Sequence, residues 1–166
     1  TSPAEPVPEV HHDYSGCEPS RLSAYGVIPS DLNSWEVGFA KWLDNDETGR
    51  VLWWLRNPSR RGYTKGWGTC LIRPSGGFFF PDFVVAVQGR STPDQIVLCE
   101  IKGGHLQNED DSLEKIQVSH RSYQAVRWAE YDSKRNQLLR LAYDSSANRI
   151  LPRGLLDVDS LVVTSG

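Results

Sequence analysis

The chain lacks methionine, lacks any apolar run long enough to cross a membrane, and has only three cysteines in 166 residues. A membrane-spanning helix needs about 20 mostly apolar residues, so the sequence predicts no membrane span. The chain also does not open with the apolar core of a secretory signal. Because methionine is missing even at position 1, we expect this chain to be a processed product or an excised piece of a larger protein, and its proline-rich start favours the second.

The cysteines Cys17, Cys70 and Cys99 are odd in number and lack the spacing of metal ligands. Cys99 lies in an apolar run and is expected to be a small core residue. This usage favours a reducing, cytoplasmic setting over a disulfide scaffold. The net charge of -3 gives no overall attraction for nucleic acid. Any DNA affinity must therefore come from local basic clusters or from a metal ion that bridges to phosphate.

The composition is that of one globular domain, with 39% hydrophobic and 23% charged residues. Five prolines fall among the first 29 residues, which predicts that residues 1–29 are a linker or N-terminal extension. The domain itself is expected to cover residues 30–166.

A first helix is predicted to begin near residues 31–35, with Ser30 or Asn33 as its cap. Glu36 is expected on the flank of the apolar stripe of this helix. The stripe itself consists of Trp35, Phe39, Trp42 and Leu43.

Hydrophobic periodicity then predicts several strands, a long helix and a further strand. The strands cover residues 50–55, 63–72, 78–87 and 95–100, the long helix covers 112–130, and the last strand covers 138–143. Strict alternation along the first of these strands would put Arg56 on the same face as Trp54 and opposite Val51. This order of elements predicts an α/β fold with a central mixed β-sheet flanked by α-helices.

The most informative stretch is Pro81-Asp82 followed, eighteen residues later, by Glu100-Ile101-Lys102. Turn residues lie between the two strands, so a hairpin can bring Asp82 beside Glu100. Because side chains alternate along a strand, Glu100 and Lys102 share one face and Ile101 points to the other. Two carboxylates beside an ammonium group can bind a hard divalent cation and place a water next to it.

This arrangement resembles the PD-(D/E)xK motif of restriction-endonuclease-like nucleases. The wider pattern is similar to the nuclease domain at the C-terminus of superfamily 2 helicases, a group that includes the restriction subunit of type III restriction enzymes. The resemblance covers about residues 30–130. It is carried by Trp35-Glu36, Phe39-Ala40, Leu43, Trp54-Leu55-Arg56-Asn57-Pro58, Gly62-Tyr63, Pro81-Asp82-Phe83, Glu100-Ile101-Lys102-Gly103 and Asn108-Glu109-Asp110.

The resemblance implies a restriction-endonuclease-like core and Mg²⁺-dependent cleavage of DNA, with Mn²⁺ able to substitute. It implies that Asp82 and Glu100 hold the metal, with the carbonyl of Ile101 as a third ligand. Glu36 would complete this site through water or help a second ion. Lys102 would orient or deprotonate the attacking water. A helicase or ATPase region of the same parent protein, acting in restriction or phage defence, would be the partner.

DNA contacts are expected at the densest basic cluster, which has Tyr63 and Trp67 between its charges and could form a phosphate track with stacking residues. The alternative is a solvated hairpin with aromatic core anchors. Further contacts are expected beyond the motif strand and on the long helix. The DNA-binding candidates are Arg56, Arg60, Arg61, Lys65, His105 and Lys115.

Alternatives stay open for the function, the mode of cutting and the number of chains that cut. A non-catalytic nucleic-acid-binding or assembly module would keep the fold without cleavage, and a two-carboxylate glycosidase is kept in view by the six tryptophans. An endonuclease is favoured over an exonuclease, because neither Gln117 nor Gln124 has a tyrosine four residues later. Nicking by a monomer and paired cutting by a homodimer both agree with one active centre per chain.

Overall fold

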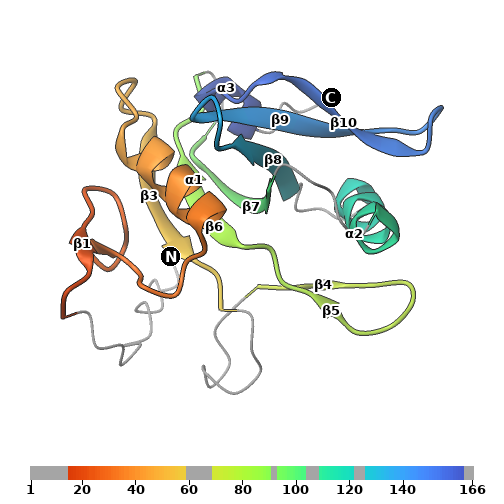
Figure 1. Cartoon of the computed structure of the whole chain (residues 1–166), viewed down its shortest axis with the longest axis horizontal. Coiled ribbons are helices and arrows are strands. Elements are labelled where there is room, and N and C mark those ends of the chain that lie inside the picture. Colours follow the sequence, from red (N-terminus) through yellow and green to blue (C-terminus); the bar gives the residue numbers. More distant parts are fainter. Residues whose placement is uncertain (1–14, 59–68, 91–92, 104–108, 122–125, 163–166) are drawn as a thin grey trace.

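A six-stranded mixed β-sheet forms the centre of the computed structural model, which describes residues 15–58, 69–90, 93–103, 109–121 and 126–162 (Figure 1). In spatial order its strands are β10 (Arg149–Leu155), β9 (Gln137–Asp144), β8 (Val126–Asp132), β7 (Gln95–Gly103), β6 (Phe83–Val87) and β3 (Val51–Arg56). Among these described strands, β7 and β8 run parallel and every other neighbouring pair is antiparallel. The predicted α/β character and mixed sheet are therefore confirmed.

Two longer helices pack against opposite faces of this sheet. Helix α1 (Ser34–Asp44) shares a buried cluster with Val85 and Val87, whereas helix α2 (Glu109–Arg121) shares another with Val84. Alternate residues of β6 thus belong to the two clusters, as the pleat of a strand requires. A parallel pair needs a crossover connection, and α2 lies in the one that joins β7 to β8. The short helix α3 (Val158–Leu161) contributes to the α1 side.

The start of α1 is fixed by a reciprocal cap. The Asn33 side chain accepts hydrogen bonds from the backbone N–H groups of Trp35 and Glu36, which confirms Asn33 rather than Ser30 as the cap. In return, the Glu36 carboxylate accepts the Asn33 N–H at 2.9 Å, a capping box. Glu36, which was expected beside the apolar stripe, is itself buried. Of the predicted apolar stripe, Phe39 and Leu43 are buried, whereas Trp35 is 42% exposed.

Strand β3 contains a bulge that breaks the predicted alternation. Val51 pairs with Val87 and Trp53 pairs with Ala86, so β3 has one residue more than its partner over this stretch. Val51 and Trp54 therefore both lie in the α1-side core. Arg56 pairs across the ladder with Phe83, another residue of that core, and paired side chains share a face, so Arg56 points to the α1 side. The prediction that Trp54 and Arg56 lie opposite Val51 is wrong for this reason.

The long helix predicted over 112–130 is also wrong in its second half. Helix α2 ends at Arg121, and the residues from Val126 onward form β8. Trp128 pairs with Glu100 of β7 in the parallel ladder. Apolar residues at positions 126 and 128 fit the two-residue period of a strand, which the helical interpretation overlooked.

The described part of the predicted N-terminal extension packs on the domain. Strands β1 (Glu18–Pro19) and β2 (Val27–Ile28) pair with each other, and Ile28 joins the α1-side core. The Asp44 carboxylate, at the end of α1, accepts a hydrogen bond from Ser20 Oγ at 2.9 Å. Residues 15–29 therefore pack against α1 and the α1-side core rather than standing apart from the domain.

A second small sheet precedes β6. It pairs β4 (Leu71–Ile72) with β5 (Phe78–Phe79), and Arg73 ties it to Glu114 of α2. The predicted strand over 78–87 is thus divided into β5 and β6 by Pro81-Asp82. Of the strand predicted over 63–72, residues 63–68 lie outside the described part of the chain. No helix within the described ranges is long and apolar enough to cross a membrane.

Candidate active site

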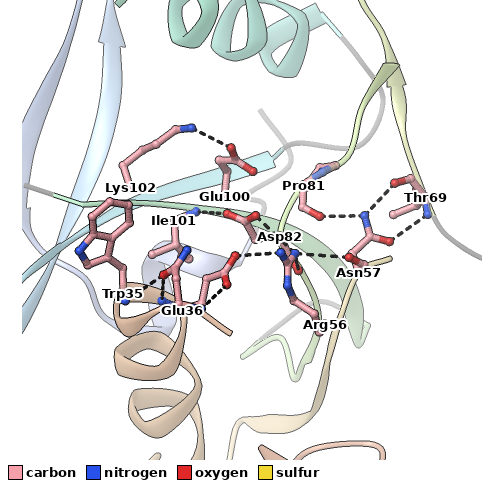
Figure 2. Close-up of polar contacts among 11 residues, drawn as sticks. Trp35, Glu36, Arg56, Asn57, Thr69, Pro81, Asp82, Glu100, Ile101 and Lys102 are labelled. Carbon is pink, nitrogen blue, oxygen red and sulfur yellow. Dashed lines mark hydrogen bonds and ion pairs between the residues drawn. The ribbon is translucent and has the colours of Figure 1, made fainter. Parts of the chain in front are cut away.

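The β6–β7 ladder places Asp82 beside Glu100, as the sequence predicted. Phe83 pairs with Cys99, and Asp82 comes one residue before this pair while Glu100 comes one residue after it. The Asp82 Oδ2 atom accepts the backbone N–H of Ile101 at 2.8 Å. A side-chain oxygen here accepts the next backbone N–H beyond the β6–β7 ladder, and this bond holds the Asp82 carboxylate at the end of the sheet (Figure 2).

Asn57 holds the Pro81-Asp82 turn from the end of β3. Its side chain is buried and donates to the carbonyl of Pro81 at 2.7 Å and to that of Thr69 at 2.9 Å. Its side-chain oxygen accepts the Thr69 N–H at 3.1 Å, and its own N–H donates to the Asp82 carbonyl at 2.8 Å. The backbone that carries Asp82 is therefore fixed on both sides by one amide residue.

Glu100 and Lys102 occupy the α2 side of the sheet. The Lys102 Nζ atom lies 2.9 Å from Glu100 Oε1 and 5.4 Å from the ring centroid of Trp128. Glu100 is 5% exposed, and its Oε2 atom has no hydrogen-bond partner among the described residues. Burial, and then the Asp82 carboxylate, raise the pKa of Glu100 to about 8. An unpaired buried carboxylate oxygen is costly unless a ligand or a proton satisfies it.

Glu36 and Arg56 occupy the other side of Asp82 (Figure 2). An Arg56 guanidinium nitrogen lies 2.9 Å from Glu36 Oε1, and the other donates to the Asp82 carbonyl at 2.8 Å. The same group lies 3.4 Å from Asp82 Oδ1. Burial raises the pKa of Glu36, and the Asp82 carboxylate adds to this, whereas the Asn33 N–H and Arg56 oppose it. The sequence predicts Arg56 as a DNA contact; in the structure its guanidinium group is directed at the carboxylates of Glu36 and Asp82.

The other predicted DNA contacts are only partly described. Lys115 lies on α2, 2.7 Å from Asp111 Oδ2 and 5.5 Å from the ring centroid of Phe79. It also lowers the pKa of Glu100, so its charge acts on the α2 side of the site. The predicted contacts that lie outside the described residues are Arg60, Arg61, Lys65 and His105.

Two aromatic residues at the site were missed as site residues in the sequence. Trp128 borders Lys102, but it was assigned to a helix. The Trp35 indole lies on Gly103 so closely that a Cβ at that position would be 2.1 Å from the ring. A glycine directly after a motif strand was the signal for this close approach. Trp35 thus joins the start of α1 to the end of β7.

The carboxylates at this site suit one hard cation that keeps some of its waters, rather than a metal ion enclosed entirely by side chains. Within the described residues, no group of three His, Cys, Asp or Glu side chains is arranged to hold a metal ion. Asp82 and Glu100 still offer two adjacent carboxylates, one with an unmatched oxygen. Mg²⁺ keeps several waters and is commonly held by one or two carboxylates together with substrate phosphate. The residues present therefore fit a Mg²⁺ ion on the α2 side of Asp82.

Comparisons with protein-family models, with curated proteins and with solved structures find no match to this chain. The function must therefore be argued from the geometry of the site.

Proposed function

We propose that this chain is a Mg²⁺-dependent DNA endonuclease domain with a restriction-endonuclease-like core. The observation that carries the proposal is the meeting of Asp82, Glu100 and Lys102 at adjacent strand ends, with one Glu100 oxygen buried and unmatched. A mixed sheet flanked by helices supports the same family. We further propose that the domain works in the cytoplasm beside a helicase or ATPase region of its parent protein, in restriction or phage defence.

Asp82 and Glu100 would hold the metal together with the carbonyl of Ile101. The bound ion would lower the pKa of a coordinated water and neutralise the scissile phosphate. Glu100, whose pKa is about 8, would release its proton as it becomes a ligand. Lys102 is held 2.9 Å from Glu100 and against Trp128, so its ammonium group would orient the attacking water or stabilise negative charge on the phosphate.

Cleavage of supercoiled plasmid tests the proposal. The parent chain should nick or linearise the plasmid in Mg²⁺ and do nothing in EDTA. The variants D82N, E100Q and K102M should each lower the rate by about 100-fold or more. The control K41M changes a half-exposed lysine of α1 that pairs with Glu18, and it should cut like the parent. Equal cutting by the parent and all three site variants would rule the assignment out.

A non-catalytic binding or assembly module is the second candidate. It is favoured by one observation: Arg56 and Lys102 both already pair with acidic residues of the site. Such a module would bind DNA or a partner protein without metal-dependent nicking, so the plasmid assay separates the two. For an active nuclease, product analysis at varied protein concentration would distinguish nicking by a monomer from paired cutting by a homodimer.

A further inference from the structure

Asp82 divides the acidic residues into two sides that differ in how their oxygens are matched. On the α1 side, Glu36 Oε1 pairs with Arg56 and Glu36 Oε2 accepts the Asn33 N–H. On the α2 side, Glu100 Oε1 pairs with Lys102, and Glu100 Oε2 has no partner within the described ranges. A further cation can therefore gain a free carboxylate oxygen on the α2 side but must displace an existing partner on the α1 side.

The partner on the α1 side is permanent and firmly held. A guanidinium group keeps its positive charge at every pH at which proteins are folded. Arg56 contacts Glu36 Oε1 at 2.9 Å, the Asp82 carbonyl at 2.8 Å and Asp82 Oδ1 at 3.4 Å. It also lies 6.0 Å from the ring centroid of Phe83, and its side chain is only 21% exposed. Its position is thus set from several directions.

Two-metal sites place their ions about 3.5–4 Å apart, on either side of a shared oxygen ligand. Asp82 is the carboxylate between the two sides here, and Arg56 already contacts its Oδ1 atom together with Glu36. We propose that Arg56 takes the place of a second divalent cation, so that the centre binds a single ion on the Asp82–Glu100 side. This inference rests on the proposed function, because it counts the ions at the nuclease site.

Glu36 then has a different task from a metal ligand. It neutralises and orients Arg56, and it is itself oriented by its reciprocal bond with the cap of α1. The chain keeps a positive charge beside Asp82 before any ion or DNA arrives. One bound ion and one guanidinium group would together balance the charge that develops on the phosphate.

Titration of the full chain with Mn²⁺, without DNA, tests this. Calorimetry and the electron paramagnetic resonance signal of free Mn²⁺ give the number of ions and their affinity. The parent should bind one ion. E36Q, in which the glutamine can still accept the Asn33 N–H, should bind one ion with an affinity within about twofold of the parent. D82N and E100Q should weaken binding by about tenfold or more.

The variant R56Q opens the α1 side and should bind two ions. Its matched control is the double variant E36Q/R56Q, which removes the acid together with the base and should return the count to one. Three results would each overturn the inference while leaving the nuclease proposal standing. The parent could bind two ions, a folded R56Q could bind only one, or E36Q could bind Mn²⁺ as weakly as D82N does. A parent that binds no Mn²⁺ would overturn both. If R56Q does not fold, the parent and E36Q results decide the question.

Discussion

The two sides of Asp82 use the same kinds of residue to different ends. On the α1 side, an acid and a base complete each other, and a helix cap fixes the acid. On the α2 side, an acid and a base also meet, but the acid keeps one oxygen unmatched and has a pKa of about 8. On the α1 side, both carboxylate oxygens of Glu36 have a partner. On the α2 side, Glu100 Oε2 can still accept a ligand. The comparison shows that two buried acid–base pairs can differ in whether every carboxylate oxygen has a partner.

The largest expected difference between the two sides is in what their bases contribute to stability. R56M leaves Glu36 and Asp82 without their cation in a nearly buried setting, and we expect a loss of about 3 to 4 kcal/mol in the free energy of unfolding at pH 7. K102M should lose only about 1 kcal/mol, because Glu100 is mostly protonated at that pH and methionine can still pack on Trp128.

Urea unfolding in EDTA measures this difference. If R56M and K102M lose the same free energy of unfolding, the two acid–base pairs contribute equally to stability and the proposed difference between the two sides is wrong.

The second prediction concerns pH. Glu100 has a pKa of about 8 when folded and about 4.5 when unfolded, so the folded state binds its proton more tightly. Its contribution to stability is fully present below pH 4.5 and is lost as the pH rises to 8. E100Q, which cannot ionise, should therefore gain about 4 kcal/mol relative to the parent between these pH values.

Unfolding curves in EDTA from pH 4.5 to 8 test the E100Q prediction. The control E47Q changes an exposed residue and should keep the pH dependence of the parent. A parent and an E100Q that stay parallel across this range would contradict the assignment of an ionisable, unmatched Glu100.

The third prediction concerns the residue on which both sides depend. N57A removes the side-chain bonds to Pro81 and Thr69 and should lower stability by about 2 kcal/mol. It should also weaken Mn²⁺ binding, because Asp82 loses its fixed backbone. N45A, at the exposed end of α1, should change stability by about 0.5 kcal/mol or less. An N57A variant as stable as N45A would show that the turn holds itself in place.

The smallest expected effect is at the contact between Trp35 of α1 and Gly103 of β7. G103A would put a methyl group within 2.1 Å of the Trp35 ring, which must then move. Because Trp35 is 42% exposed and can turn away, the loss should be only about 1 kcal/mol. In a W35A background the same change should have almost no effect. A double-mutant cycle by urea unfolding measures the coupling, and a coupling near zero would place the two residues apart in solution.

The parts of the site that the sequence predicted are those encoded by neighbouring residues. The hairpin that joins Asp82 to Glu100 follows from two apolar runs separated by turn residues, and the Asn33 cap follows from a polar residue three positions before Glu36. Both signals are local. Physical rules that act within a few residues therefore sufficed for them.

The parts that the sequence did not predict depend on pairing across the sheet. The basic run that includes Arg56 looks like a surface track, and only the register with β6 shows that this arginine faces Glu36. Trp128 fits a helical pattern locally, and the parallel ladder with β7 makes it a strand residue. Contacts between residues far apart in the chain decided both cases, and local periodicity does not contain them.

The bulge in β3 makes the charges of the site insensitive to one change in chain length. The ladder pairs Val51 with Val87 on one side of the extra residue and Arg56 with Phe83 on the other. Deleting Leu52 would remove the bulge and leave both pairs in place, so Arg56 would stay on the α1 side beside Glu36. The register from Trp53 to Arg56, rather than the full length of β3, therefore determines the electrostatics of the site.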